Sequence, residues 1–316
     1  MGATHHTLPL PPRSSQVSVR SPKIDPRRIR VVVPVYKDWE GLKITLESLG
    51  RLNPRPGAIT VANDNADTSV PSWLKAYPIQ VINYRNNRGP AYARNRGAEN
   101  PGTACDWIYF TDCGCEHVRN LITHFRNAQE ASGDSVVAVC GTVKGKGSGR
   151  INRYMTEMSI LNPPFEDALG PRGEEIPQAI ITANALVYAP VFHQLGGFST
   201  AFGEAGGEDL DLGIRLRQLG RLVYAPRAIV SHEFDEDLQD FQRRFERYGR
   251  ANRLVEQVHK LPSLRPEPFK AELEFSDLAK LQIESLRRGY DEAQLANRVK
   301  FPARFLKRAA LKILKG

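Results

Sequence analysis

The chain has 316 residues, of which 41% are hydrophobic and 25% charged, an ordinary composition that excludes collagen-like, coiled-coil and wholly disordered classes. Its mean hydropathy is −0.41, and its longest apolar runs are strand-sized, well short of the ~20 residues of a membrane-spanning helix. The formal net charge of +9 arises at the two ends, residues 1–30 and 298–316, so the slightly acidic body offers no general nucleic-acid surface.

The first half of the chain alternates strand and helix patterns. Residues 1–28 are rich in Pro, Ser and Arg and predict a mobile basic tail. The β-branched run 29–35 predicts a strand, and Leu42, Leu46 and Leu49 then mark one face of a helix. Further segments of this kind are strands at 58–62, 79–83 and 107–110 and a helix starting at 89–98. Repeated strand–helix units predict an α/β fold with a Rossmann-like, mostly parallel sheet flanked by helices.

The second half is less regular. Strands are predicted at 136–140 and 180–188, and between them lie a Gly/Lys-rich turn at 144–150 and an irregular, proline-bearing segment at 162–177. Such an insertion either lines a site or is a loose loop. A helix is predicted at 209–219, and Leu238, Phe241, Phe245 and Tyr248 recur at the spacing of another amphipathic helix.

The four cysteines, Cys105, Cys113, Cys115 and Cys140, do not form the pattern of a secreted disulfide framework. The N-terminal region lacks an apolar signal core. We therefore expect a reducing, cytoplasmic location.

Polar clusters follow several predicted strands, where an open α/β sheet binds its ligand. Pro34, Val35 and Tyr36 end the first strand, and Asn63 and Asp64 end the second. A carboxylate there could accept a hydrogen bond from a nucleotide base, whereas the structural alternative is a turn with Asx caps.

A third cluster, residues 86–97, opens a helix with Gly89 and carries Arg88 and Arg94. A helix N-terminus and guanidinium groups favour a phosphate, and the alternative is a solvated basic helix.

A fourth cluster places Thr111, Asp112 and Glu116 directly after a buried strand, where hard oxygen ligands suit Mg²⁺ or Mn²⁺ bridging a diphosphate. Cys113 and Cys115 with a nearby histidine could instead bind zinc, although no second cysteine pair accompanies them, or simply pack locally.

Two further groups could carry chemistry. Glu208, Asp209 and Asp211 lie in the first turn of a predicted helix, where one carboxylate could remove a proton from an acceptor hydroxyl. Acidic residues are favoured in a first turn by the helix dipole alone, so a capped helix is the alternative. His232 ends a strand and is either a metal ligand or a strand-end residue without a ligand.

In this order, the clusters resemble the family 2 glycosyltransferases of the GT-A fold over roughly residues 30–253. The carrying motifs are the strand ending in Pro-Val-Tyr, the Asn-Asp-Asn stretch, Asn-Arg-Gly with Ala-Arg-Asn, the segment closing in Gly-Gly-Phe, and Gly-Glu-Asp-Leu-Asp-Leu at 207–212. The resemblance implies that Asp209 is the general base and that Glu208 supports the acceptor site. It further implies roles for Asn184 and Gly197 near the acceptor sugar and for His232 near the diphosphate.

The resemblance also implies a nucleotide site and a divalent cation. The implied nucleotide-binding residues are Pro34, Val35, Tyr36, Asn63, Asp64, Arg88, Gly89, Arg94 and Thr111. The family's Asp-x-Asp motif has Gly114 as its last residue here, so Mn²⁺ or Mg²⁺ would rest on Asp112 with Glu116 or His232. In this chain, Asn63 stands where the family has the first Asp of its base-binding pair. Asp64 would therefore be the residue that accepts a hydrogen bond from a uracil N–H.

The expected protein is an inverting glycosyltransferase that uses a nucleotide-diphosphate sugar, most simply a UDP-sugar, with a sugar, glycolipid or small-molecule acceptor, in cell-envelope glycan or glycolipid synthesis. Its expected parts are a tail at 1–28, a GT-A domain at 29–260 divided into nucleotide-binding (29–135) and acceptor (136–260) parts, and a C-terminal helical extension at 261–316.

Alternatives from other classes are a catalytically silent nucleotide-sugar binding protein and a nucleotidyltransferase, although the latter's Gly-rich basic signature is missing after the first strand. Phe301, Phe305, Ala309 and Ile313 recur among basic residues, so this end is either a peripheral helix on an anionic membrane or a solvated basic helix.

Overall fold

The computed structural model describes residues 8–10, 19–65, 69–84, 86–99, 104–133, 135–203, 205–234, 236–269 and 271–295. The basic helix predicted near 300–315 lies outside these residues, as does most of the predicted tail. The described part of that tail includes Ile24, which is buried and whose backbone N–H donates to Gln129 at 3.0 Å.

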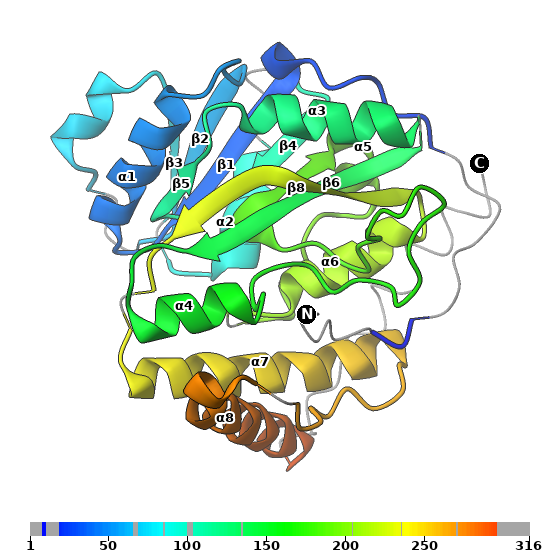
Figure 1. The fold of residues 1–316 in the computed structure, drawn as a ribbon. Helices are drawn as coiled ribbons and strands as arrows, with labels where there is room; N and C mark the ends of the chain where they lie inside the picture. Colours follow the sequence, from blue (N-terminus) through cyan, green and yellow to red (C-terminus); the bar gives the residue numbers. More distant parts are fainter. Residues whose placement is uncertain are drawn as a thin grey trace.

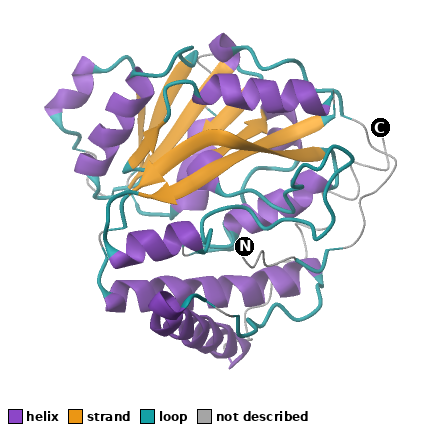
Figure 2. Cartoon of the chain, viewed as in Figure 1, coloured by secondary structure: helices purple, strands orange, loops and turns teal. Residues whose placement is uncertain are grey.

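One mixed sheet organises the described residues (Figures 1 and 2). Its strands are β1 Ile29–Val35, β2 Ala58–Asn63, β3 Gln80–Asn83, β4 Trp107–Phe110, β5 Cys115–His117, β6 Val136–Gly145, β7 Ala185–Tyr188 and β8 Arg221–His232. The helices are α1 Trp39–Gly50, α2 Pro90–Ala98, α3 Leu121–Ser132, α4 Arg150–Glu157, α5 Ala189–Gln194, α6 Glu208–Arg217, α7 Leu238–His259 and α8 Ser276–Leu295.

The strand order is β3-β2-β1-β4-β7-β6-β8-β5. The part of the sheet formed by β1 to β4 is parallel, since β1 pairs in parallel with β2 and β4, and β2 with β3. Strand β7 is antiparallel to β4 and β6, and β5 is antiparallel to β8. The predicted α/β fold with a largely parallel sheet and a C-terminal helix is confirmed.

Both faces of the sheet are covered. Val31 and Val33 of β1 pack with α1 and α3, whereas Val32 packs on the other face with α2, α5 and α6. This alternation explains why the strand reads as one continuous apolar run.

A separate helical layer lies beside the sheet, formed by α4, α7 and α8 (Figure 1). Helices α7 and α8 approach closely because Gly249 faces the backbone of Leu286 and Gly289 faces the backbone of Glu246, where a Cβ would overlap with backbone atoms. None of the helices in the described ranges is both long and apolar enough to span a lipid bilayer.

Two predicted segments differ from the structure. Within the strand predicted at 180–188, residues 182–184 form a 3-10 turn and only 185–188 pair, because the buried Asn184 amide donates to the carbonyls of Thr142 and Ala228. The turn predicted at 144–150 is shorter in the structure, because β6 continues to Gly145 and helix α4 begins at Arg150. Helix α4 packs its buried Tyr154 and Met155 on α7 and α8.

Candidate functional site

A cavity of about 530 Å³ lies where the sheet meets the helical layer. Side chains from four of the sequence clusters line it: Arg94, Asp112, Glu208, Asp209 and His232. Most of the remaining wall comes from segment 158–164, helices α7 and α8, and the connection at 263–267, and residues 8–9, 181–183 and 205–207 also contribute to it. Residues distant in the sequence therefore share one cavity.

The N-terminus of α6 presents its carboxylates to this cavity. Gly207 precedes the helix with φ 86° and packs so tightly against Phe202 and Ala251 that a Cβ would lie 2.9 Å from each of them. This conformation strongly favours glycine. The buried Glu208 carboxylate accepts from the Gly206 N–H at 2.7 Å, and Asp209 accepts from the Leu210 N–H at 2.9 Å.

Asp209 has the electrostatics of a base that works near neutral pH. Burial and the adjacent Glu208 carboxylate raise the pKa of Asp209 to about 7, against the opposing effect of Arg94. A carboxylate with a pKa near ambient pH is a far better proton acceptor than an ordinary aspartate. Asp209 can therefore accept a proton from a hydroxyl bound in the cavity.

Arg94 connects the acidic groups. Its buried guanidinium donates from Nη1 to Glu208 at 2.9 Å and from Nη2 to Asp112 at 2.7 Å. These carboxylates raise the pKa of Arg94 against the effect of its burial. The side chain that we expected to contact diphosphate is thus held between two protein carboxylates.

Asp112 and His232 both line the cavity, and His232 lies beside Gly114. The Gly114 backbone has φ 79°, and a Cβ there would lie 3.3 Å from His232 Nε2. His232 Nε2 lies 3.1 Å from the Cys113 carbonyl, to which it must donate, and its buried Nδ1 has no hydrogen-bond partner. Glu116 diverges from this pair and forms an ion pair with Lys146.

The resemblance implies a divalent cation beside Asp112. Within the described ranges, no group of three or more His, Cys, Asp or Glu side chains could hold a metal ion. Asp112 and the unpartnered His232 nitrogen instead fit a cation completed by substrate phosphates, as is usual for Mg²⁺. The zinc alternative fails in this part of the chain, where Cys113 and Cys115 are buried and local hydrogen bonds occupy His117.

Apart from Arg94, the predicted nucleotide-binding residues lie outside the cavity lining. Most of them are at the ends of β1 and β2 and at the start of α2. The Asp64 carboxylate accepts from the backbone N–H groups of Arg88 and Gly89, at 3.0 and 2.8 Å. It thereby joins the end of β2 to the start of α2. Asn63 donates to Asn83 at 2.8 Å, and the Tyr36 ring is half exposed. The Arg88 guanidinium stacks over the Tyr92 ring at 4.5 Å.

Three other predicted residues lie in the interior and do not line the cavity. Thr111 is fully buried and donates to the Ala183 carbonyl at 3.1 Å. Asn184 accepts from the Tyr109 hydroxyl at 3.0 Å, so its whole side chain is committed to the core. Gly197 has φ 72° and packs against Asn95 and Phe192, where a side chain would clash.

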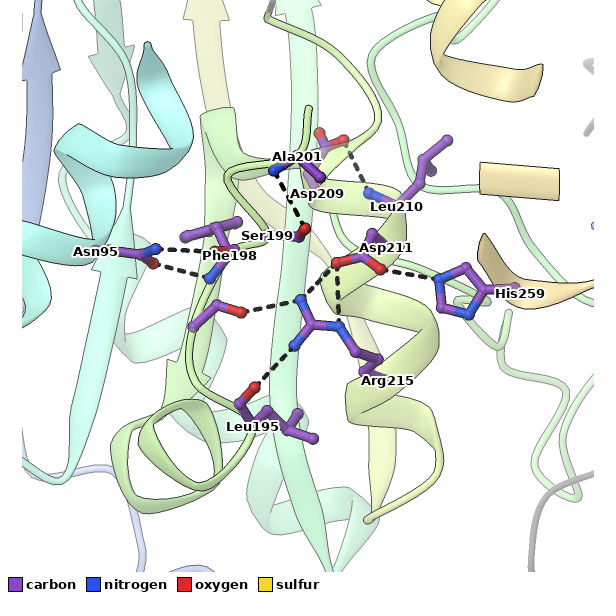
Figure 3. Close-up of polar contacts among 11 residues, drawn as sticks. Asn95, Leu195, Phe198, Ser199, Ala201, Asp209, Leu210, Asp211, Arg215 and His259 are labelled. Carbon is purple, nitrogen blue, oxygen red and sulfur yellow. Dashed lines mark hydrogen bonds and ion pairs between the residues drawn. The ribbon is translucent and has the colours of Figure 1, made fainter. Parts of the chain in front are cut away.

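Figure 3 shows a supporting network that sequence reasoning did not assign. Asn95 of α2 donates to the Phe198 carbonyl and accepts from its N–H, both at 2.8 Å. Arg215 of α6 donates to the Gly197 carbonyl at 2.9 Å and to Asp211, which also contacts His259 of α7 at 2.9 Å. Two features of the sequence could have indicated this network. They are the position of Asn95 beside Arg94 in one motif and the i,i+4 spacing of Asp211 and Arg215.

Comparisons with known proteins find similar sequences. The family described as Glycosyl transferase family 2 matches residues 30–195. A curated relative, the pre-mycofactocin glycosyltransferase of Mycobacterium tuberculosis, is 29% identical over 238 residues, covering 71% of this chain and 46% of the relative. The chain thus spans less than half the length of that relative.

Solved structures share the fold. A mannosyltransferase from Pyrobaculum calidifontis in complex with GDP-Man and Mn²⁺ superposes with a TM-score of 0.55 at 15% identity, covering 93% of this chain and 82% of that one. GalNAc-T7 with UDP, GalNAc and Mn²⁺ gives 0.52 at 14% identity, covering 90% and 57%. The predicted GT-A fold is confirmed.

Proposed function

The chain belongs to glycosyl transferase family 2, and on this premise we propose that it is an inverting glycosyltransferase. It moves a sugar from a nucleotide-diphosphate donor, a UDP-sugar in our proposal, to an acceptor hydroxyl. The observation that carries the proposal is the single cavity shared by Asp112 and Asp209. The name of the curated relative and the nucleotides bound in two similar structures support the substrate class.

The proposed reaction is a single displacement. Asp209 takes the proton of the acceptor hydroxyl while the oxygen attacks the anomeric carbon, and the diphosphate leaves from the opposite face with the bonding electron pair. The configuration of the sugar is therefore inverted. Glu208 supports the base by raising its pKa and by engaging Arg94.

In this proposal, the leaving diphosphate lies between Asp112 and His232 on one side and Arg88 on the other. Asp112 and His232 would hold Mn²⁺ or Mg²⁺, which supplies charge stabilisation to the departing oxyanion. We assign the remaining neutralisation to Arg88, because Arg94 is already engaged by two carboxylates. Asp64 positions Arg88 through the adjacent backbone.

A thermal-shift screen with product analysis tests the proposal. UDP, GDP, dTDP and their sugars are added with Mn²⁺ and with EDTA; UDP ligands should raise the melting temperature in Mn²⁺ by several degrees more than in EDTA. Release of UDP from a UDP-sugar separates an enzyme from a silent binding protein, and proton NMR of the product reports the anomeric configuration. Absence of a shift with every nucleotide, or retention of configuration, would contradict the proposal.

A further inference from the structure

One arginine of the cavity forms no ion pair with a carboxylate of the described residues. Arg247 of α7 lines the cavity, and its Nε is buried without a hydrogen-bond partner. The other cavity arginines of the described ranges are neutralised: Arg94 by Asp112 and Glu208, Arg244 by Glu236 at 2.9 Å, and Arg265 by Asp291 at 2.9 Å. The Nε of Arg94 lacks a hydrogen-bond partner too, but its Nη atoms pair with two carboxylates, whereas Arg247 has neither kind of partner within the described residues. An arginine in this state favours an anion bound in the cavity.

Much of the cavity wall around this cation is apolar. It includes Met158, Ile160 and Leu161 from the segment after α4, Phe245 from α7, and Ile283 and Leu286 from α8. These side chains belong to the hydrophobic cluster of the helical layer. A cavity of this size and lining suits a largely apolar molecule with a few fixed polar contacts.

The position of the cavity favours the acceptor over the donor. Apart from Arg94, Asp112 and His232, most of its wall is built by α6, α7, α8 and the segments 158–164 and 263–267, and it includes none of Tyr36, Asp64 or Arg88. Arg247 lies in the same helix as Tyr248 and Ala251, which pack on Gly206 and Gly207 just before Asp209. A molecule held by Arg247 would therefore share the cavity with the candidate base.

We propose that the acceptor is an amphiphilic alcohol whose apolar body fills the space between segment 158–164 and helices α7 and α8, and whose carboxylate or phosphate pairs with Arg247. This inference rests on the proposed function, because it gives the cavity to the acceptor. An arginine fork binds both anions by paired N–H donors, so the two share one recognition chemistry.

Direct binding measurements on the full chain, saturated with UDP and Mn²⁺, test this inference. The probes are 10-hydroxydecanoate, its neutral counterpart 1,10-decanediol, and 10-hydroxydecyl phosphate, each titrated by calorimetry. The variants are Arg247→Met and Arg247→Lys. Arg243→Met is the matched control, because Arg243 lies on the same helix but is mostly exposed and pairs with Asp240.

We expect the wild type to bind an anionic probe at least tenfold more tightly than the diol. Arg247→Met should abolish that preference without changing diol binding, Arg247→Lys should keep part of it, and Arg243→Met should leave it intact. Tighter binding of the phosphate or of the carboxylate identifies which anion the acceptor carries. The wild-type comparison alone remains decisive if Arg247→Met does not fold.

Equal wild-type affinity for acids and diol would overturn the inference. So would an Arg247→Met variant that loses UDP affinity and keeps its preference for acids, because the arginine would then serve the donor. UDP affinity of the wild type, measured first, separates these outcomes from a failure of the proposed function, in which no nucleotide binds at all.

Discussion

The Arg94 guanidinium donates to Asp112 at 2.7 Å and to Glu208 at 2.9 Å, so one side chain of α2 joins the end of β4 to the start of α6. Two carboxylates of the cavity, one on each side of Arg94, are thereby fixed by a single buried cation. The negative charges of Asp112 and Glu208 are therefore compensated by this arginine.

Arg94→Met should be strongly destabilising, because it leaves the buried Glu208 carboxylate without its counter-charge. We expect a loss of about 3–5 kcal/mol in the free energy of unfolding, measured by urea denaturation. The double variant with Glu208→Gln should recover part of the loss, since the uncompensated charge is then removed. Strictly additive losses in the double variant would show that the two side chains are not coupled.

Asn95→Ala should also lower stability, by about 1–3 kcal/mol, because it removes both hydrogen bonds to the Phe198 backbone. Asn95→Asp makes the test specific. A carboxylate can still accept from the Phe198 N–H but cannot donate to its carbonyl, so this variant should be destabilised as well. Unfolding curves of both variants that overlay the wild type would refute the bridging role.

Gly114→Ala should cost about 1–2 kcal/mol of unfolding free energy, because φ is 79° and the added Cβ would lie 3.3 Å from His232 Nε2. Gly50→Ala is the matched control, since Gly50 is in α1 and a Cβ there meets nothing within 4 Å. That change should be neutral or stabilising. Equal effects at both sites would argue against strain at Gly114.

The pH dependence of transfer follows from the pKa of Asp209, which burial and Glu208 raise to about 7. A general base must be ionised, so activity should fall as the pH drops below 7 and level off above it. We expect kcat/KM to change about tenfold per pH unit on the acidic limb. An acidic limb centred near pH 4 would mean that the base is an ordinary carboxylate or another group.

Much of the sheet could be predicted from local patterns. The β-branched run 29–35 and the aromatic run 107–110 coincide with β1 and β4, because strands buried on both faces are continuously apolar. Strand β5, residues 115–117, was not predicted, since three residues carry no periodicity and pairing with β8 alone defines it.

Motif order predicted which residues would lie near one another better than it predicted the surroundings of each side chain. Asp112, Asp209 and His232 were predicted near one ligand, and they line one cavity. The interior placement of Asn184 could not be predicted, because its partners Thr142 and Ala228 come from β6 and β8. Arg247 could not be predicted for a similar reason, because a helical pattern does not reveal which of its charged side chains lacks a hydrogen-bond partner in the fold.

The most direct test of the central claim is turnover by Asp209→Asn, measured as sugar transfer under saturating donor with UDP affinity determined in parallel. Asparagine keeps the shape of the side chain but cannot take up the acceptor proton. We predict that transfer falls roughly 1000-fold while UDP affinity stays within about twofold of the wild type. Transfer that remains within about tenfold of the wild type would contradict the assignment of Asp209 as the base.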